Sequence, residues 1–158
     1  MRVRRWWIPV AVLVVTAAAC FRSSGSPVII NDFRCPVDGS RYTDDYGPRG
    51  SGFHYGIDML APTGTNLWAV KDGNVQYASE SAGGLVAYLF ADGGNVYYYA
   101  HMSGIIGAGD RRVAQGDVIG LVGESGNATA PHLHFEIRLG SVTAHGIDPY
   151  PTLKNAGC

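Results

Sequence analysis

The chain has 158 residues, 46% of them hydrophobic and 16% charged, and a formal net charge of −1. Residues 20–158 carry nine basic and thirteen acidic side chains, a net charge of −4, with no basic cluster. This length suits one domain with a proper hydrophobic core, and the charge excludes nucleic acid as an expected partner.

The N-terminal residues 1–19 have the features of an export signal. Three arginines, Arg2, Arg4 and Arg5, precede a mostly apolar run over residues 6–19. That run is shorter than the roughly 20 residues that a membrane-spanning helix needs, but it fits the hydrophobic region of a signal peptide. We therefore predict an extracytoplasmic protein, with an uncleaved anchor helix as the alternative.

The chain has three cysteines, and all of them come after the predicted export signal. Cys20 stands directly after "AAA" and before "FRSSGSP", which resembles a bacterial lipoprotein signal and predicts an acylated N-terminus that attaches the protein to the membrane. Cys35 and Cys158 then remain as a pair. An exported domain lies in a compartment that permits a disulfide between them, although two separate thiols are the alternative.

Residues 20–34 are predicted to form a tether and residues 35–158 a single domain. Glycines separate short β-type segments in this domain, and no stretch of 11 residues keeps helical periodicity. We expect an all-β fold, an antiparallel β-sandwich or half-barrel with Gly-rich loops around a metal cleft. The expected strands are 66–70, 73–79, 85–90, 95–101, 117–122 and 132–139.

The last of these strands has two clearly different faces. In "PHLHFEIRL", residues 131–139, His132, His134, Glu136 and Arg138 share one side, and the residues between them are apolar. The two imidazoles lie roughly 6.6 Å apart along an extended chain, so they could serve one centre. The spacing allows both to bind a metal, and a half-exposed strand without a functional role is the alternative.

Two further motifs supply possible ligands. "HYGID" places His54 and Asp58 four residues apart, and His101 ends the strand-like segment "YYYAH". With the histidines of the last strand, they provide mixed nitrogen and oxygen donors, which suit Zn²⁺ with an open position for water. His145 lies outside these motifs and is interpreted as an ordinary loop histidine.

The motifs "HYGIDMLAPTGTNLWAVKDGNV", "YYYAHMS", "QGDVIGLVGESGNATAPHLHFEIR" and "DPYP" together resemble the lysostaphin-type peptidoglycan metallopeptidases, the LytM-like domains. The resemblance implies a zinc endopeptidase that cuts peptide cross-links of the bacterial cell wall. It also implies metal ligation by His54, Asp58 and His134, and catalytic roles for His101 and His132.

The chain contains no H-E-x-x-H motif, so no glutamate is preset as a general base. Imidazoles titrate near working pH, and His101 and His132 are therefore expected to transfer protons.

One alternative is a non-catalytic wall-binding or hydrolase-activating domain, because a fold does not fix a function. Another is a carrier-type β domain with a modified Lys71, which leaves the histidines unexplained.

Overall fold

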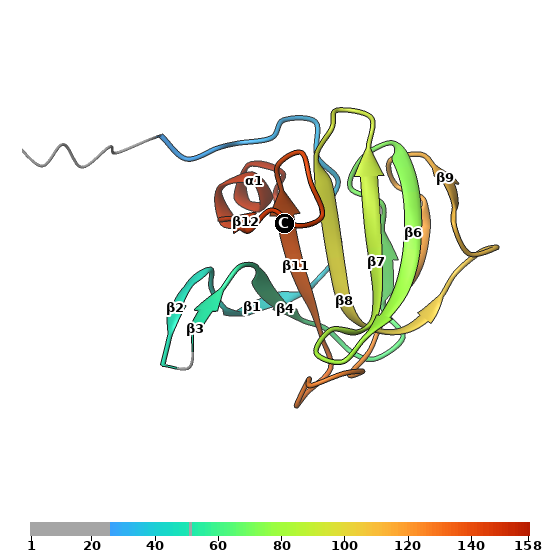
Figure 1. Ribbon diagram of the computed structural model, residues 1–158, viewed down its shortest axis with the longest axis horizontal. Coiled ribbons are helices and arrows are strands. Elements are labelled where there is room, and N and C mark those ends of the chain that lie inside the picture. Colours follow the sequence, from blue (N-terminus) through green and yellow to red (C-terminus); the bar gives the residue numbers. More distant parts are fainter. Residues whose placement is uncertain (1–25, 51) are drawn as a thin grey trace, which may run out of the picture.

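The computed structural model describes residues 26–50 and 52–158 (Figure 1). The predicted export signal and Cys20 lie outside the described residues. The described ranges form twelve strands and one short helix. The elements are β1 Arg41–Asp44, β2 Gly47–Arg49, β3 Gly52–His54, β4 Ile57–Leu60, β5 Asn66–Trp68, β6 Gly73–Glu80, β7 Gly84–Ala91, β8 Val96–Ile105, β9 Arg111–Val113, β10 Val118–Val122, β11 His132–Arg138, β12 Gly146–Ile147 and α1 Tyr150–Asn155. Within the described ranges, no helix has the length and apolar character needed to cross a bilayer.

Ten of these strands form one antiparallel sheet. Its main path runs β1-β4-β11-β8-β7-β6-β9, while β10 pairs with β5 and β8, and β12 pairs with β11. The remaining two strands, β2 and β3, form a hairpin that projects from the sheet (Figure 1). The all-β antiparallel prediction is confirmed, and the sheet does not close into a barrel.

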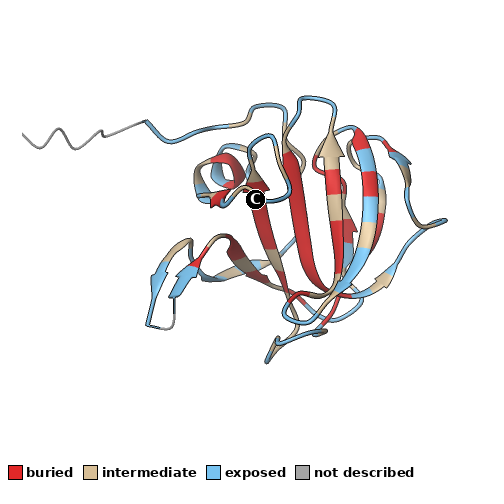
Figure 2. Cartoon of the chain, in the orientation of Figure 1, coloured by how far each residue is buried: buried red, intermediate tan, exposed pale blue. Residues whose placement is uncertain are grey.

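Strand β11 lies between β4 and β8 and joins the core to the polar face. Leu133, Phe135 and Ile137 are fully buried, and the ring of Phe135 packs edge-on against Tyr99 at 5.3 Å between centroids. The alternation predicted for this strand is therefore present, with the apolar face in the core. Figure 2 shows that the neighbouring strand β8 is buried along most of its length.

The six predicted strands are all present with shifted ends. The largest difference concerns the strand predicted over 95–101, which continues in β8 to Ile105. His101 therefore lies inside a strand rather than at its end, and its φ of 63° is positive. Since non-glycine residues rarely adopt this left-handed conformation, the backbone turns locally at His101 while the pairing with neighbouring strands continues.

The end of the predicted tether packs against the domain. The ring of Phe33 makes edge contacts with Tyr97 and Phe135, at 5.6 and 6.2 Å between centroids, and the backbone N–H of Ile30 donates to Thr152 Oγ1 at 3.1 Å. The packed part of the chain thus begins before residue 35, because an aromatic side chain in the tether covers the core.

A disulfide joins the two ends of the described domain. Cys35 and Cys158 are bonded, with 5.4 Å between their Cα atoms and a sequence separation of 123. Cys158 follows helix α1, which contributes the fully buried Leu153 to the core. The disulfide therefore fastens the N-terminal segment to the C-terminal helix.

Candidate metal centre

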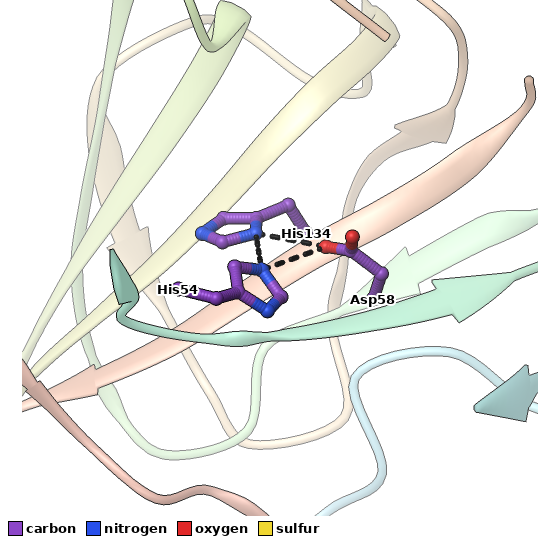
Figure 3. Close-up of side chains that lie close together, drawn as sticks. All are labelled: His54, Asp58 and His134. Atoms are coloured by element: carbon purple, nitrogen blue, oxygen red, sulfur yellow. Dashed lines mark hydrogen bonds and ion pairs between the residues drawn. The ribbon is translucent and has the colours of Figure 1, made fainter. Parts of the chain in front are cut away.

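Three side chains from different strands meet on the polar face of the sheet (Figure 3). His54 ends β3, Asp58 lies on β4, and His134 lies opposite Asp58 in the β4–β11 register. His54 Nε2 is 2.8 Å from His134 Nδ1 and 3.1 Å from Asp58 Oδ1, which is 2.9 Å from His134 Nδ1. One atom of each residue therefore points to a common centre.

The glycine of "HYGID" allows this approach. A Cβ atom on Gly56 would lie 2.5 Å from the backbone oxygen of Phe135 and 2.8 Å from His134 Cε1. Cβ atoms in proteins essentially never lie this close to backbone atoms. Only glycine therefore allows the chain between β3 and β4 to pack directly on β11. Gly56 thereby brings His54 and Asp58 to His134.

Hydrogen bonds also fix the atoms of the three side chains that face away from the common centre. His54 Nδ1 donates to the backbone oxygen of Asp45 at 2.9 Å, and His134 Nε2 donates to Glu136 Oε1 at 2.9 Å. Arg49 donates to Asp58 Oδ2 at 3.1 Å. Such outer partners fix the tautomer and orientation of metal-binding imidazoles, and they leave the inner nitrogens as ligands.

The donor set fits a zinc ion. The three inner atoms lie 2.8 to 3.1 Å apart, and ligand atoms around tetrahedral zinc, with bonds of about 2.0–2.1 Å, lie about 3.3 Å apart. Two imidazole nitrogens and one carboxylate oxygen also match the three-ligand sets of catalytic zinc sites, which keep a fourth position open.

Electrostatics keep Asp58 anionic. Burial alone would raise the pKa of Asp58, but the polar contacts with His134 and His54 outweigh it and hold this pKa well below its usual range. Burial alone would lower the pKa of His134, yet its bonds to Asp58 and Glu136 raise it. The centre therefore offers a negatively charged ligand, as a divalent cation requires.

Two more histidines flank the centre. His132 Nε2 is 3.8 Å from Asp58 Oδ1, and the ring of His132 lies 4.6 Å from that of His101 between centroids. His132 Nδ1 donates to the Ala130 oxygen and His101 Nδ1 to the Ser125 oxygen, each at 2.8 Å. With Nδ1 protonated, Nε2 of each neutral ring is free to accept a proton.

Burial lowers the pKa of His101, and the neighbouring His132 and His134 act in the same direction, outweighing the bond to Ser125. His101 is thus neutral at neutral pH and can act as a base. The structure brings this ring together with the other four predicted site residues in one cleft of about 530 Å³. His145, in contrast, does not line this cleft.

Glu136 and Arg138 support the centre, a role that the sequence did not reveal. Glu136 is 7% exposed, and Arg138 Nε donates to Glu136 Oε2 at 2.7 Å. The guanidinium of Arg138 lies over the ring of Tyr98 at 4.4 Å. Both residues lie on the same face of β11 as His134, and this shared face was the only feature of the sequence that could have indicated their role.

The sequence profile of peptidase family M23 matches residues 52–149, more than half of the chain. The chain belongs to peptidase family M23. This region contains every histidine and the aspartate of the centre. The family membership and the open β-sheet agree with the predicted resemblance to lysostaphin-type enzymes.

Named relatives of this M23 chain are endopeptidases. It is 36% identical over 121 residues to the glycyl-glycine endopeptidase ALE-1 of Staphylococcus capitis, covering 71% of this chain and 33% of that protein. It is 32% identical over 117 residues to the peptidoglycan DD-endopeptidase ShyC of Vibrio cholerae, covering 69% and 27%. The chain thus matches about a third or less of the length of these relatives.

A solved structure shares the fold. The catalytic domain of lysostaphin from Staphylococcus simulans superposes with a TM-score of 0.68 at 32% identity, over 73% of this chain and 92% of that domain. The similarity therefore extends over almost the whole lysostaphin catalytic domain.

Proposed function

We propose that the chain is a zinc-dependent endopeptidase that hydrolyses peptide cross-links of bacterial peptidoglycan. The observation that carries the proposal is the convergence of His54, Asp58 and His134, with donor atoms 2.8 to 3.1 Å apart, in a cleft that also contains His101 and His132. Membership of family M23 supports the same assignment.

The proposed ligands of the zinc ion are His54, Asp58 and His134. When bound, zinc lowers the pKa of a water molecule toward about 7 and polarises the scissile carbonyl. Glu136 orients His134 through its Nε2–H, while Arg49 orients Asp58 through Oδ2. These contacts hold the ligand atoms in place before substrate arrives.

His101 and His132 are proposed to move the protons. Peptide hydrolysis adds water oxygen to the carbonyl carbon, breaks the C–N bond and leaves a proton on the departing amine. A neutral Nε2 on one ring accepts the proton from water, and the other ring, when protonated, stabilises the developing negative charge on the carbonyl oxygen. Their Nδ1–H bonds to backbone oxygens fix both rings for these roles.

The substrate and the location follow from the family. The named relatives include a glycyl-glycine endopeptidase and a peptidoglycan DD-endopeptidase, so both glycine bridges and direct cross-links are candidate substrates. We place the protein outside the cytoplasm, because its proposed substrate is the wall, residues 1–19 have the features expected of an export signal, and Cys35 is bonded to Cys158.

Digestion of purified cross-linked wall peptides by the zinc-loaded protein tests this proposal. Mass spectrometry should detect cleaved peptides with new amino and carboxyl ends, a chelator should stop the reaction, and added zinc should restore it. If glycine-bridged and direct cross-links both stay uncut under zinc-replete conditions, the enzyme proposal is wrong. The alternative, a non-catalytic wall-binding or hydrolase-activating domain, would then be favoured.

A further inference from the structure

Four aromatic rings form a continuous row at the cleft. Tyr46 contacts Phe53 at 5.0 Å between ring centroids, Phe53 contacts Tyr55 at 4.8 Å, and Tyr55 contacts His145 at 4.2 Å. Phe53 and Tyr55 line the cleft that holds the metal centre. We call these four residues the aromatic row.

The fold builds this row from two separate parts of the chain. Tyr46, Phe53 and Tyr55 belong to the β2–β3 hairpin and its flanks, whereas His145 lies just before β12. A Cβ atom on Gly146 would collide with the backbone oxygen of Tyr55, so a glycine is needed there for the two segments to meet. The rings of Tyr55 and His145 then stack with only 13° between their planes.

The row keeps much of its apolar surface in water. Phe53 is 42% exposed, His145 is exposed, and Tyr46 and Tyr55 are half-buried. Packing in the core accounts for none of these exposed faces, because all four residues lie outside the buried core cluster. Exposed apolar surface that continues from a ligand cleft is typical of a binding surface.

We propose that the aromatic row binds the pyranose rings of the peptidoglycan glycan strand, beside the cleft in which the peptide is cut. This inference rests on the proposed function, because it takes peptidoglycan as the substrate. A pyranose ring has a flat face of C–H groups that packs on an aromatic ring, and its hydroxyls hydrogen-bond to polar ring edges. Tyrosine and histidine supply such edges next to an apolar ring face.

The net negative charge of the domain favours an uncharged sugar at the row over the free carboxylates of a stem peptide. Residues 26–158 hold eight basic and thirteen acidic side chains, a net charge of −5. The two arginines that line the cleft are already paired, Arg49 with Asp44 and Asp58, and Arg138 with Glu136. A carboxylate of a bound ligand near the row would therefore be repelled by the acidic side chains of the domain.

Asp148 follows His145 by three residues and adds negative charge near the row. Burial first, and then the negative charge of Asp148, raise the pKa of the Tyr46 hydroxyl. A carboxylate at this position accepts hydrogen bonds from sugar hydroxyls and repels an anionic peptide. The row and Asp148 thus combine an apolar platform with an acceptor at its edge.

Binding of peptide-free glycan chains tests the proposal. The probe is an uncharged, peptide-free glycan, a soluble oligomer of N-acetylglucosamine, titrated into the zinc-loaded full chain by calorimetry. Wild type should bind saturably, and His145→Ala should bind about 3- to 10-fold more weakly because one ring contact is lost. His145→Phe keeps a flat ring and should bind within about twofold of wild type.

Two controls separate the row from general surface effects. Ile106→Ala removes an exposed apolar side chain, 38% exposed, from the loop between β8 and β9, outside the residues that line the cleft, and should bind like wild type. Zinc content of each variant reports whether the metal centre is intact.

Failure to bind peptide-free glycan in wild type, or equal binding by His145→Ala, would overturn the proposal. Binding of sugar-free stem peptides that His145→Ala weakens, without binding of glycan, would assign the row to the peptide and also overturn it. The binding assay needs no hydrolysis. Glycan binding without peptide cleavage would therefore contradict only the proposed function, and peptide cleavage without glycan binding would contradict only this inference.

Discussion

The individual histidines of the centre differ in which nitrogen faces it. His134 presents Nδ1 because its Nε2 is bonded to Glu136, whereas His54 presents Nε2 because its Nδ1 is bonded to the Asp45 oxygen. The two-residue spacing in "PHLHF" placed both histidines on one face but left their roles open. The pairing of β11 with β4, which sequence alone does not supply, puts His134 rather than His132 opposite Asp58.

Glu136 is predicted to strengthen zinc binding through His134. Glu136→Gln keeps the shape and an acceptor oxygen but removes the charge that pairs with Arg138 and His134, so zinc affinity should fall about 10- to 100-fold. Competition with a fluorescent chelator measures this affinity. Glu124→Gln makes the same chemical change at an exposed position and serves as the control; an equal loss in both variants would contradict the role of Glu136.

His101 is predicted to titrate below its usual pKa of about 6.5. Burial penalises the charged imidazolium, and a bound zinc ion, being positive, acts in the same direction. The pH must therefore fall further than usual before His101 takes up a proton, so the neutral base persists into mildly acidic solution. NMR titration of the ring carbons, with His101→Asn to assign the signal, measures the midpoint. A midpoint at or above 6.5 would be incompatible with this account.

At the scale of elements, long segments were predictable, whereas most of the short strands, apart from β5, were not. Strand β11 and the β6–β7 pair carry clear patterns over seven or eight residues, and all were predicted. Strands β1 and β4 have four residues each, too few for a periodic signal. Asp58 was recognised only through "HYGID", because the strand that carries it was missed.

The disulfide is predicted to contribute strongly to stability. The bond between Cys35 and Cys158 closes a long loop, since the two cysteines have a sequence separation of 123, and it restricts the unfolded chain. The double variant Cys35→Ser/Cys158→Ser should lower the free energy of unfolding by about 2 to 5 kcal/mol, as measured by urea denaturation. Thiol labelling of protein isolated from the envelope provides the independent check: two reactive cysteines there would rule out the bond.

For the whole molecule, the predicted tether and the cleft occupy different parts of the domain. The segment before residue 35 packs through Phe33 on the core, whereas the cleft lies on the polar face of β4 and β11. The proposed anchoring and the proposed catalysis should therefore be open to separate alteration. Neither the packing of Phe33 nor the meeting of Tyr55 with His145 was predictable, because each joins segments far apart in sequence.

Membrane attachment is predicted to depend on Cys20, which lies outside the described residues. A single acyl chain holds a protein only marginally, so stable attachment needs the several chains of a bacterial lipoprotein. Cys20→Ser should move the protein from the membrane fraction to the soluble fraction, as followed by immunoblotting. A variant that stays in the membrane with residues 1–19 uncleaved would support an anchor helix instead.

Zinc content measured beside turnover in purified His134→Ala and His132→Ala tests the central claim most directly. His134→Ala removes a proposed ligand, so it should lose zinc and activity together. His132→Ala should keep close to one zinc per chain, while turnover falls by about 10² to 10⁴ through loss of proton transfer. Zinc lost from His132→Ala and retained by His134→Ala would contradict the account.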